Sequence, residues 1–191
     1  PIHGNHSLAH SFDNASSSRD RLSLEYHVNL DNNPVTWRFL VRYDYNPSGS
    51  NNWGFFLAAD QPSEDMHPSG NVNGYLVGVN YSGSDDYINL WKVVSGSGYS
   101  ILETDFNWQE QIAPGSVTGM EVTRTRKGQW ILKLDTAADF RNLFSLGKAM
   151  DTSFLTSRFI GVYHEYTASA DRKLAFDDIY VGKPIQDTLP P

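Results

Sequence analysis

The sequence predicts an all-β protein, a two-sheet antiparallel β-sandwich. Apolar and polar residues alternate with a period of two along most of the chain, and turn-forming clusters recur roughly every eight to twelve residues. No helical period of 3.6 persists for three turns, and no strand–helix–strand alternation is present. With 39% hydrophobic and 13% aromatic residues, the 191-residue chain can fill a single core.

The first two strands are predicted most clearly. Over residues 22–30, five apolar side chains alternate with polar ones, so all five should lie on one face of a strand. Residues 35–43 repeat this pattern, with Trp37 in phase with Phe39 and Val41. We therefore expect Trp37 to be a core residue.

The remaining elements follow from β-rich runs between clusters of Gly, Asn, Ser and Asp. Further strands are predicted at 53–58, 74–80, 87–94, 99–102, 120–125, 129–134, 158–166 and 173–181. Tight turns are predicted at 95–98, 126–128 and 168–171, and one or two helical turns at 137–146. We expect residues 1–182 to form one domain and the proline-ended residues 183–191 to form a linker.

Composition argues against several function classes. The net charge of −7 is unfavourable for binding nucleic acid, which requires a positive surface. The absence of cysteine rules out disulfides and thiolate metal sites. No run of residues is apolar over the length needed for a membrane span, and no signal peptide is recognisable. The abundance of Asn, Ser, Gly and Tyr favours a secreted or cell-surface bacterial protein, tethered to other domains of a longer chain.

Several runs carry a resemblance to a known family. They are Asn73–Asp86, Leu90–Val93, Val122–Arg124 with Gly128–Trp130, Phe159–Tyr163 and Phe176–Val181. In this order they resemble the laminin-G-like, concanavalin A-like lectin/glucanase domains of secreted multidomain proteins from Bacteroidetes-type bacteria. The resemblance implies a jelly roll. It leaves function open, since this fold carries lectins, carbohydrate-binding modules, glycoside hydrolases, polysaccharide lyases and adhesion domains.

The sequence offers little support for catalysis. Laminarinase-type relatives of this fold carry Glu-x-Asp-x-x-Glu on one strand, and this motif is absent. Lyase relatives carry Gln-x-His, which is also absent. No Gly-x-Ser-x-Gly nucleophile motif occurs either. We therefore expect a non-enzyme and assign no catalytic residue.

A sugar site would pair an exposed aromatic ring with polar side chains that bind hydroxyl groups. Trp53 follows the polar loop residues Asn51 and Asn52, so ligand contact and strand-edge packing are equally favoured. The periodicity does not settle which face Trp91 occupies. Trp108 has the sequence context of a loop residue, where it would bind a ligand or cap the core.

Two polar clusters are further candidates. Asp85 and Asp86 lie in a short connection that begins with Tyr81, where they would form Asx-type turns or bind a sugar or calcium. His164 and Tyr166 share one face of a predicted strand, which is either a glycan-binding face or a solvated strand end.

A structural calcium ion is a further expectation from the resemblance. In glucanase-type relatives a closing-strand aspartate holds calcium together with N-terminal backbone oxygens, and Asp177 matches that place. On a regular strand either Asp177 or Asp178 faces inward and needs compensation from calcium, backbone N–H groups or arginine. Asp13 and Asp20 are possible N-terminal partners.

The sequence therefore predicts a non-catalytic carbohydrate-binding module that recognises a polysaccharide or oligosaccharide. One alternative is an adhesion or spacer domain that binds protein or calcium only. Another is a glycoside hydrolase or polysaccharide lyase with an unrecognised catalytic pair.

Overall fold

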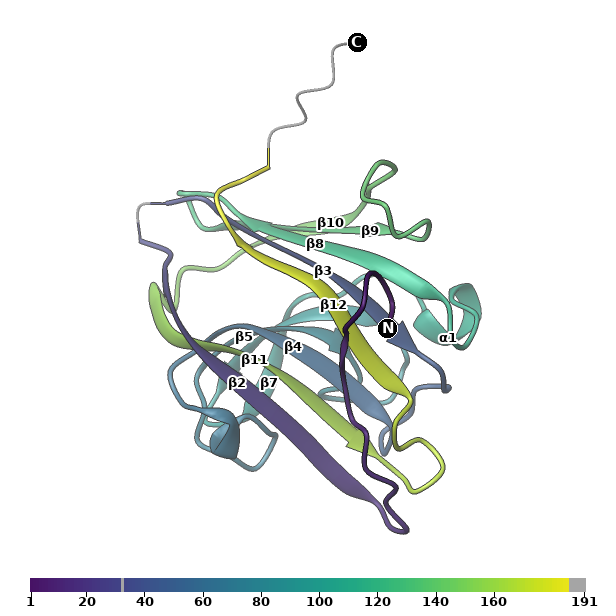
Figure 1. The fold of residues 1–191 in the computed structure, drawn as a ribbon. Helices are drawn as coiled ribbons and strands as arrows, with labels where there is room; N and C mark the ends of the chain where they lie inside the picture. The colour runs from purple at the N-terminus through teal and green to yellow at the C-terminus, as the bar shows by residue number, and fades with distance from the viewer. Residues whose placement is uncertain (32, 186–191) are drawn as a thin grey trace.

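The structure is a sandwich of two six-stranded antiparallel sheets (Figure 1). It is a computed structural model that describes residues 1–31 and 33–185. Sheet A contains, in spatial order, β1 (Leu8–Ala9), β12 (Leu174–Gly182), β3 (Val35–Tyr43), β8 (Val117–Arg124), β9 (Gln129–Asp135) and β10 (Phe144–Met150). Sheet B contains β2 (Ser18–Asn29), β11 (Thr156–Tyr166), β4 (Asn52–Ala59), β5 (Gly74–Val79), β6 (Ile88–Val94) and β7 (Ser97–Leu102).

The main core lies between the two sheets. The Phe39 ring on β3 stacks on Phe55 of β4, with centroids 4.5 Å apart. Trp37 stacks on Trp130 of β9 at 5.7 Å, and neither indole is exposed. The predicted burial of Trp37 and its in-phase neighbours is confirmed, because alternate residues of β3 face this core.

The helix predicted at 137–146 is wrong. Residues 136–143 form turns, and β10 begins at Phe144 and pairs with β9. Ala138 and Phe140 have φ values of 59° and 61°, which a right-handed helix cannot contain. The described helices are the one-turn α1 (Trp108–Gln111) and the 3-10 turn η1 (Ser63–Asp65). No described helix has the length and apolar composition that spanning a membrane requires.

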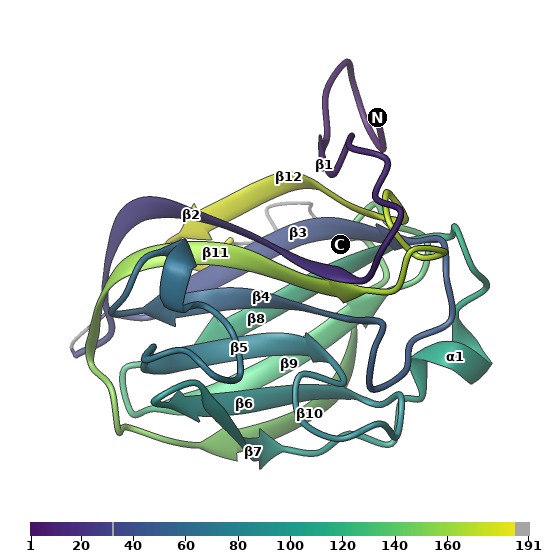
Figure 2. The same ribbon diagram turned by 90° about the horizontal axis from the view of Figure 1, so that it is seen from below.

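A second apolar cluster covers part of the outer face of sheet B. The segment between β4 and β5, which contains η1, lies over this face (Figure 2) and contributes Met66 and Val72. Trp91 of β6 and Tyr163 of β11 pack beneath these loops. A Cβ on Gly161 would lie 2.6 Å from the Leu22 carbonyl oxygen and 2.5 Å from the sulfur of Met66, so the close approach of the neighbouring strand and the loop requires glycine there.

The side of the sandwich between β2 and β12 is less covered. The alternating apolar residues of 22–30 lie on one strand as predicted, but only Val28 and Leu30 among them are buried. The side chains of Leu22 and Leu24 are 51% and 61% exposed. These two leucines lie on the edge strand of sheet B, which has a neighbouring strand on one side only.

The N-terminal segment runs along this open side, from β12 to the start of β2 (Figure 1). It is held to sheet A by the β1–β12 pairing and by a hydrogen bond from the Ser7 hydroxyl to Asp177. It is held to sheet B by Asn14, whose side-chain amide donates to the Tyr166 hydroxyl at 2.5 Å. The linker predicted at 183–191 lies largely outside the described residues and stays a prediction.

Candidate functional site

A polar groove of about 490 Å³ lies where β2 and β11 meet the loops that follow β3 and β11. Its lining residues are Ser17, Ser18, Arg19, Arg21, Ser50, Glu165, Tyr166 and Thr167. Arg19 and Arg21 share one face of β2 because strand side chains alternate. That face points outward, since Tyr163, directly opposite Arg21 on β11, belongs to the outer cluster. We call this site the arginine groove.

Glu165 lines the arginine groove, and two hydrogen-bond donors hold its carboxylate in place. Arg19 lies directly opposite it on β2 and donates a hydrogen bond of 2.9 Å to Oε1. The Tyr163 hydroxyl donates to Oε2 at 2.6 Å. Each carboxylate oxygen therefore has at least one fixed donor, and a carboxylate can accept further hydrogen bonds, such as one from a ligand hydroxyl.

The same contacts keep Glu165 ionised. Partial burial alone would raise the pKa of Glu165, but the hydrogen bonds from Arg19 and Tyr163 outweigh burial and lower it. The Asn52 side chain adds to this lowering. At neutral pH the arginine groove therefore presents a carboxylate acceptor beside cationic donors.

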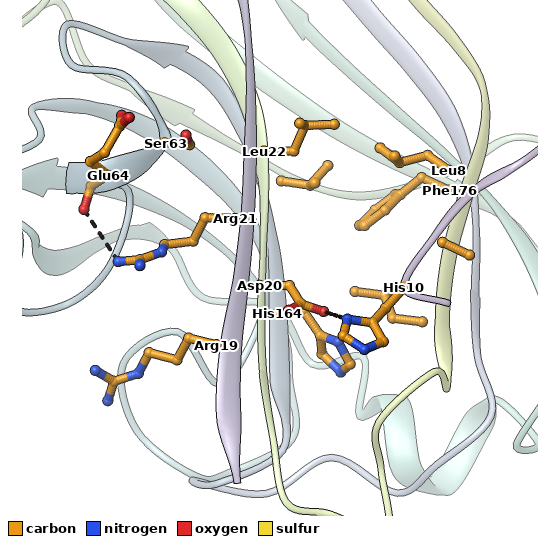
Figure 3. Close-up of a pocket in the computed structure, with 13 residues that line it drawn as sticks. Leu8, His10, Arg19, Asp20, Arg21, Leu22, Ser63, Glu64, His164 and Phe176 are labelled. Atoms are coloured by element: carbon orange, nitrogen blue, oxygen red, sulfur yellow. Dashed lines mark hydrogen bonds and ion pairs between the residues drawn. The ribbon is translucent and has the colours of Figure 1, made fainter. Parts of the chain in front are cut away.

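Arg21 is less committed to internal contacts than Arg19. One of its amino groups donates to the Glu64 carbonyl oxygen at 3.2 Å, and no carboxylate pairs with it among residues 1–31 and 33–185. Arg19 and Arg21 also line an adjacent cavity of about 450 Å³ at the edge of β2 (Figure 3). Figure 3 shows both arginines on one side of β2, with Asp20 and Leu22 on the other.

The inner side of this edge cavity carries a polar cluster of its own. His10, from the N-terminal segment, forms an ion pair with Asp20, and the Tyr166 hydroxyl donates to Asp20 at 3.1 Å. His164 is buried beside them, and its Nε2 has no hydrogen-bond partner within the described part of the chain. Burial, followed by the charge of His10, lowers the pKa of His164 to about 3. His164 is therefore a neutral core residue at physiological pH.

The three tryptophans proposed as sugar platforms are not exposed. Trp53 faces the main core and packs edge-on against Trp108, 5.2 Å away. Trp108 begins α1 and seals the end of the sandwich, while Trp91 lies in the outer cluster beneath the loops. All three side chains are at most 1% exposed, so the expectation of an exposed indole ring is wrong. Burying these large rings contributes more to folding than an exposed position would allow.

The predicted carboxamides and Tyr81 are occupied by structural contacts. Asn51 accepts hydrogen bonds from the backbone N–H and hydroxyl of Thr167, at 2.8 and 2.9 Å. Asn52 is buried beside Glu165. Tyr81 is buried, and its hydroxyl donates to the Gly96 carbonyl at 2.8 Å.

The Asx-turn interpretation of the 81–87 connection matches the structure. Asp85 accepts a hydrogen bond from the backbone N–H of Tyr87 at 3.3 Å. Asp86 and Asn80 exchange two hydrogen bonds, of 2.6 and 2.9 Å, and Asp86 has a φ of 65°. These carboxylates stabilise the turn and lie outside the arginine groove.

His164 and Tyr166 do share one face, as predicted, but it is the inner face. The His164 ring contacts Tyr43 of the opposite sheet edge-on at 5.8 Å. Both side chains are nearly fully buried, so the alternative of a solvated strand end and that of an outward glycan-binding face are both wrong.

The expectation that Asp177 or Asp178 faces the core is also wrong. A bulge between Asp177 and Tyr180 interrupts the strand alternation, and Asp178 is exposed with a φ of 47°. Burial alone would raise the pKa of Asp177, but hydrogen bonds from the His3 backbone N–H and the Ser7 hydroxyl lower it.

These contacts leave little for calcium to compensate. Backbone and hydroxyl donors already satisfy Asp177, and Asp178 pairs with His3. Asp13 pairs with Arg172 at 3.3 Å. Among the residues that the structure describes, no three His, Cys, Asp or Glu side chains are grouped as metal ligands would be.

The sequence reasoning missed Arg19, Arg21 and Glu165. Their signal was present in the alternation, because Arg19 and Arg21 share the polar phase of β2, and Glu165 is out of phase with His164. The side chains in phase with His164 face inward, so the outward face of β11 carries the other set, which includes Glu165.

The fold is shared with known sugar-binding domains, although no protein-family model and no curated protein sequence matches this chain. A carbohydrate-binding module, CBM66 of Bacillus subtilis, is 14% identical over 93% of this chain and 92% of its own, with a TM-score of 0.61. A legume lectin-like domain of Entamoeba histolytica is 9% identical over 93% and 84%, with a TM-score of 0.64. The exoplasmic domain of VIP36, in a calcium- and mannose-bound form, is 11% identical over 98% and 82%, with a TM-score of 0.66. The chain therefore has the concanavalin A-like lectin fold, a jelly-roll sandwich.

Proposed function

We propose that this protein is a non-catalytic carbohydrate-binding domain, and that the arginine groove is its binding surface. The observation that carries the proposal is the pair of outward arginines beside an ionised Glu165, in a polar groove left open by the loops. The sugar-binding proteins that share the fold support the same class of ligand.

The groove matches the chemistry of a sugar rim. Guanidinium N–H groups donate to hydroxyl or carboxylate oxygens, while Glu165 accepts from hydroxyl groups. Ser50 and Thr167 add hydroxyls on the loop side. Because Arg19 and Tyr163 hold Glu165 before any ligand arrives, little side-chain freedom is lost on binding.

We expect the affinity of one groove to be weak. Tyr166 lines the groove, but its ring lies on the inner face and is 1% exposed, so stacking contributes little and polar contacts dominate. Useful retention on a polysaccharide then requires tethering to other domains and avidity. We accordingly propose a secreted or cell-surface domain of a longer protein, which binds a polysaccharide or oligosaccharide.

The chemistry of the groove favours binding over hydrolysis. Glycoside hydrolysis generally needs two carboxyl groups, one of them protonated. Among the residues that line the groove, Glu165 alone carries a carboxyl group, and its pKa is lowered. An acid catalyst requires the opposite shift.

Affinity electrophoresis against plant, algal and microbial polysaccharides tests this proposal. We expect at least one polysaccharide to retard the wild-type protein, and Arg21→Ala to weaken that binding by about tenfold, the loss of one charge-assisted hydrogen bond. Glu165→Gln should weaken it as well, because the amide is a poorer acceptor and disturbs Arg19.

Arg158→Ala is the matched control. Arg158 is an exposed arginine of the same strand as Glu165, but it pairs with Glu25 outside the groove. Its removal should leave the retardation unchanged. Equal losses in Arg158→Ala and Arg21→Ala would indicate general charge attraction, and no retardation by any polysaccharide would contradict the proposal. Release of sugar products from a polysaccharide would replace it with an enzymatic function.

A further inference from the structure

An apolar cleft of about 670 Å³ lies along the open side of the sandwich, next to the edge cavity. Leu22, Leu24 and Tyr26 of β2 form one wall, and Ile179 and Tyr180 of β12 form the other. All five side chains are between 38% and 61% exposed. Contiguous exposure of this kind on a soluble domain is typical of an interaction site.

The edge of β2 that borders this cleft has backbone groups available for hydrogen bonding with another strand. In the described structure β2 pairs with β11 alone, so its other side presents backbone N–H and C=O groups without a ladder partner. The strand is 12 residues long and contains no proline. A long apolar edge is a template for pairing with another strand, which proteins normally protect.

We propose that the free edge of β2 receives an added β-strand from another polypeptide segment. The added strand would pair with β2 and point alternate apolar side chains into the cleft, as in recognition by β-strand addition. Its remaining side chains would lie beside Arg19 and Arg21 on the outer face. Because Arg21 has no carboxylate partner among the described residues, an acidic residue there is favoured by charge complementarity.

A second copy of this chain is a poorer occupant than a single extended segment. A second copy would bring the two edges of sheet A together, where the N-terminal segment stands beside β12 (Figure 1). His3, Asn5 and His6 of that segment are exposed and polar, so this contact would bury polar groups without evident partners.

A fluorescent nine-residue peptide that alternates valine with glutamate tests the proposal by anisotropy. We expect saturable binding, with new hydrogen-exchange protection at the β2 amides of residues 18–26. A peptide with proline in place of both its central valine and the preceding glutamate should bind at least about tenfold more weakly, because one of these two residues donates to β2 in either strand orientation. Lysine in place of glutamate should also weaken binding, because it faces the two arginines.

Leu24→Lys is the informative variant, and Tyr99→Lys is its control. Leu24 faces the cleft, whereas Tyr99 is an exposed residue of β7, the opposite edge of the same sheet. We expect Leu24→Lys to weaken peptide binding at least about tenfold and Tyr99→Lys to leave it unchanged. Neither residue lines the arginine groove, so retardation by polysaccharide should persist in both.

Three results would overturn the proposal. The first is no saturable binding of the valine–glutamate peptide. The second is equal binding of the proline-containing peptide, which would indicate adsorption of apolar side chains without strand pairing. The third is concentration-dependent dimerisation abolished by Leu24→Lys, which would assign the edge to a second copy of the chain.

Discussion

The two halves of the outer side of sheet B are built differently. Over β4, β5 and β6, loops cover the sheet and bury Trp91 and Tyr81 in a second apolar cluster. The cover reaches Tyr163 of β11 but not the start of β2 or the end of β11, where Arg19, Arg21 and Glu165 form an open polar groove. The aromatic residues of the second apolar cluster pack against the loops, whereas the charged residues of the arginine groove remain accessible to a ligand.

This difference separates stability from binding. A side chain in the covered half contributes through removal of apolar area from water and through packing. A side chain in the open half gains little from folding, because its charge stays partly hydrated. Variants in the covered half should therefore change mainly the free energy of unfolding, and variants of exposed residues in the open half should change mainly ligand binding.

The largest effect is expected for Trp91→Ala. Removing this fully buried indole should lower the free energy of unfolding by about 3–5 kcal/mol, through lost apolar burial and the cavity left behind. Urea denaturation followed by circular dichroism measures this. Tyr99→Ala on the neighbouring strand, where the ring is largely exposed, should change it by less than about 0.5 kcal/mol. A similar loss in both variants would contradict the covered arrangement of β6.

The next effect concerns His164, on the inner side of the open half. Its pKa of about 3 lies below the value of about 6.5 expected in the unfolded chain. Between these values the unfolded chain binds a proton that the folded protein does not, so stability falls as pH falls. The slope from this one group is about 1.4 kcal/mol per pH unit.

His164→Asn should remove that slope. Denaturation midpoints measured at several pH values between 5 and 6.5 would show a smaller pH dependence in the variant than in the wild type. His27→Asn, on an exposed histidine of β2, should keep the wild-type dependence. An unchanged dependence in His164→Asn would mean that His164 is not the buried titrating group.

The smallest effect is expected for Leu24→Ser. Because Leu24 is mostly exposed, its removal should change the free energy of unfolding by less than about 0.5 kcal/mol. Leu90→Ala, at a fully buried position of β6, should cost about 2–5 kcal/mol in the same assay. A large loss in Leu24→Ser would show that the open side is covered in solution.

Much of the fold was predictable from local pattern. Strand β3 was predicted at its observed bounds, Val35–Tyr43, because its alternation continues through a fully covered strand. The helix at 137–146 failed because β10 gains its ladder partner β9 from the tertiary fold, which a local pattern does not contain. The candidate site was less predictable. Alternation groups His164 with Tyr166 and separates them from Glu165, but it does not say which group faces outward.

The sequence by itself determined the strands, most of the tight turns and the two-layer class of this protein. These depend on interactions within or between neighbouring segments, which composition and period encode. The tertiary structure alone decided which strand became an edge and which face the loops covered. The same alternating pattern is buried in β3 and half-exposed in β2, because burial depends on what packs against a strand from elsewhere in the chain.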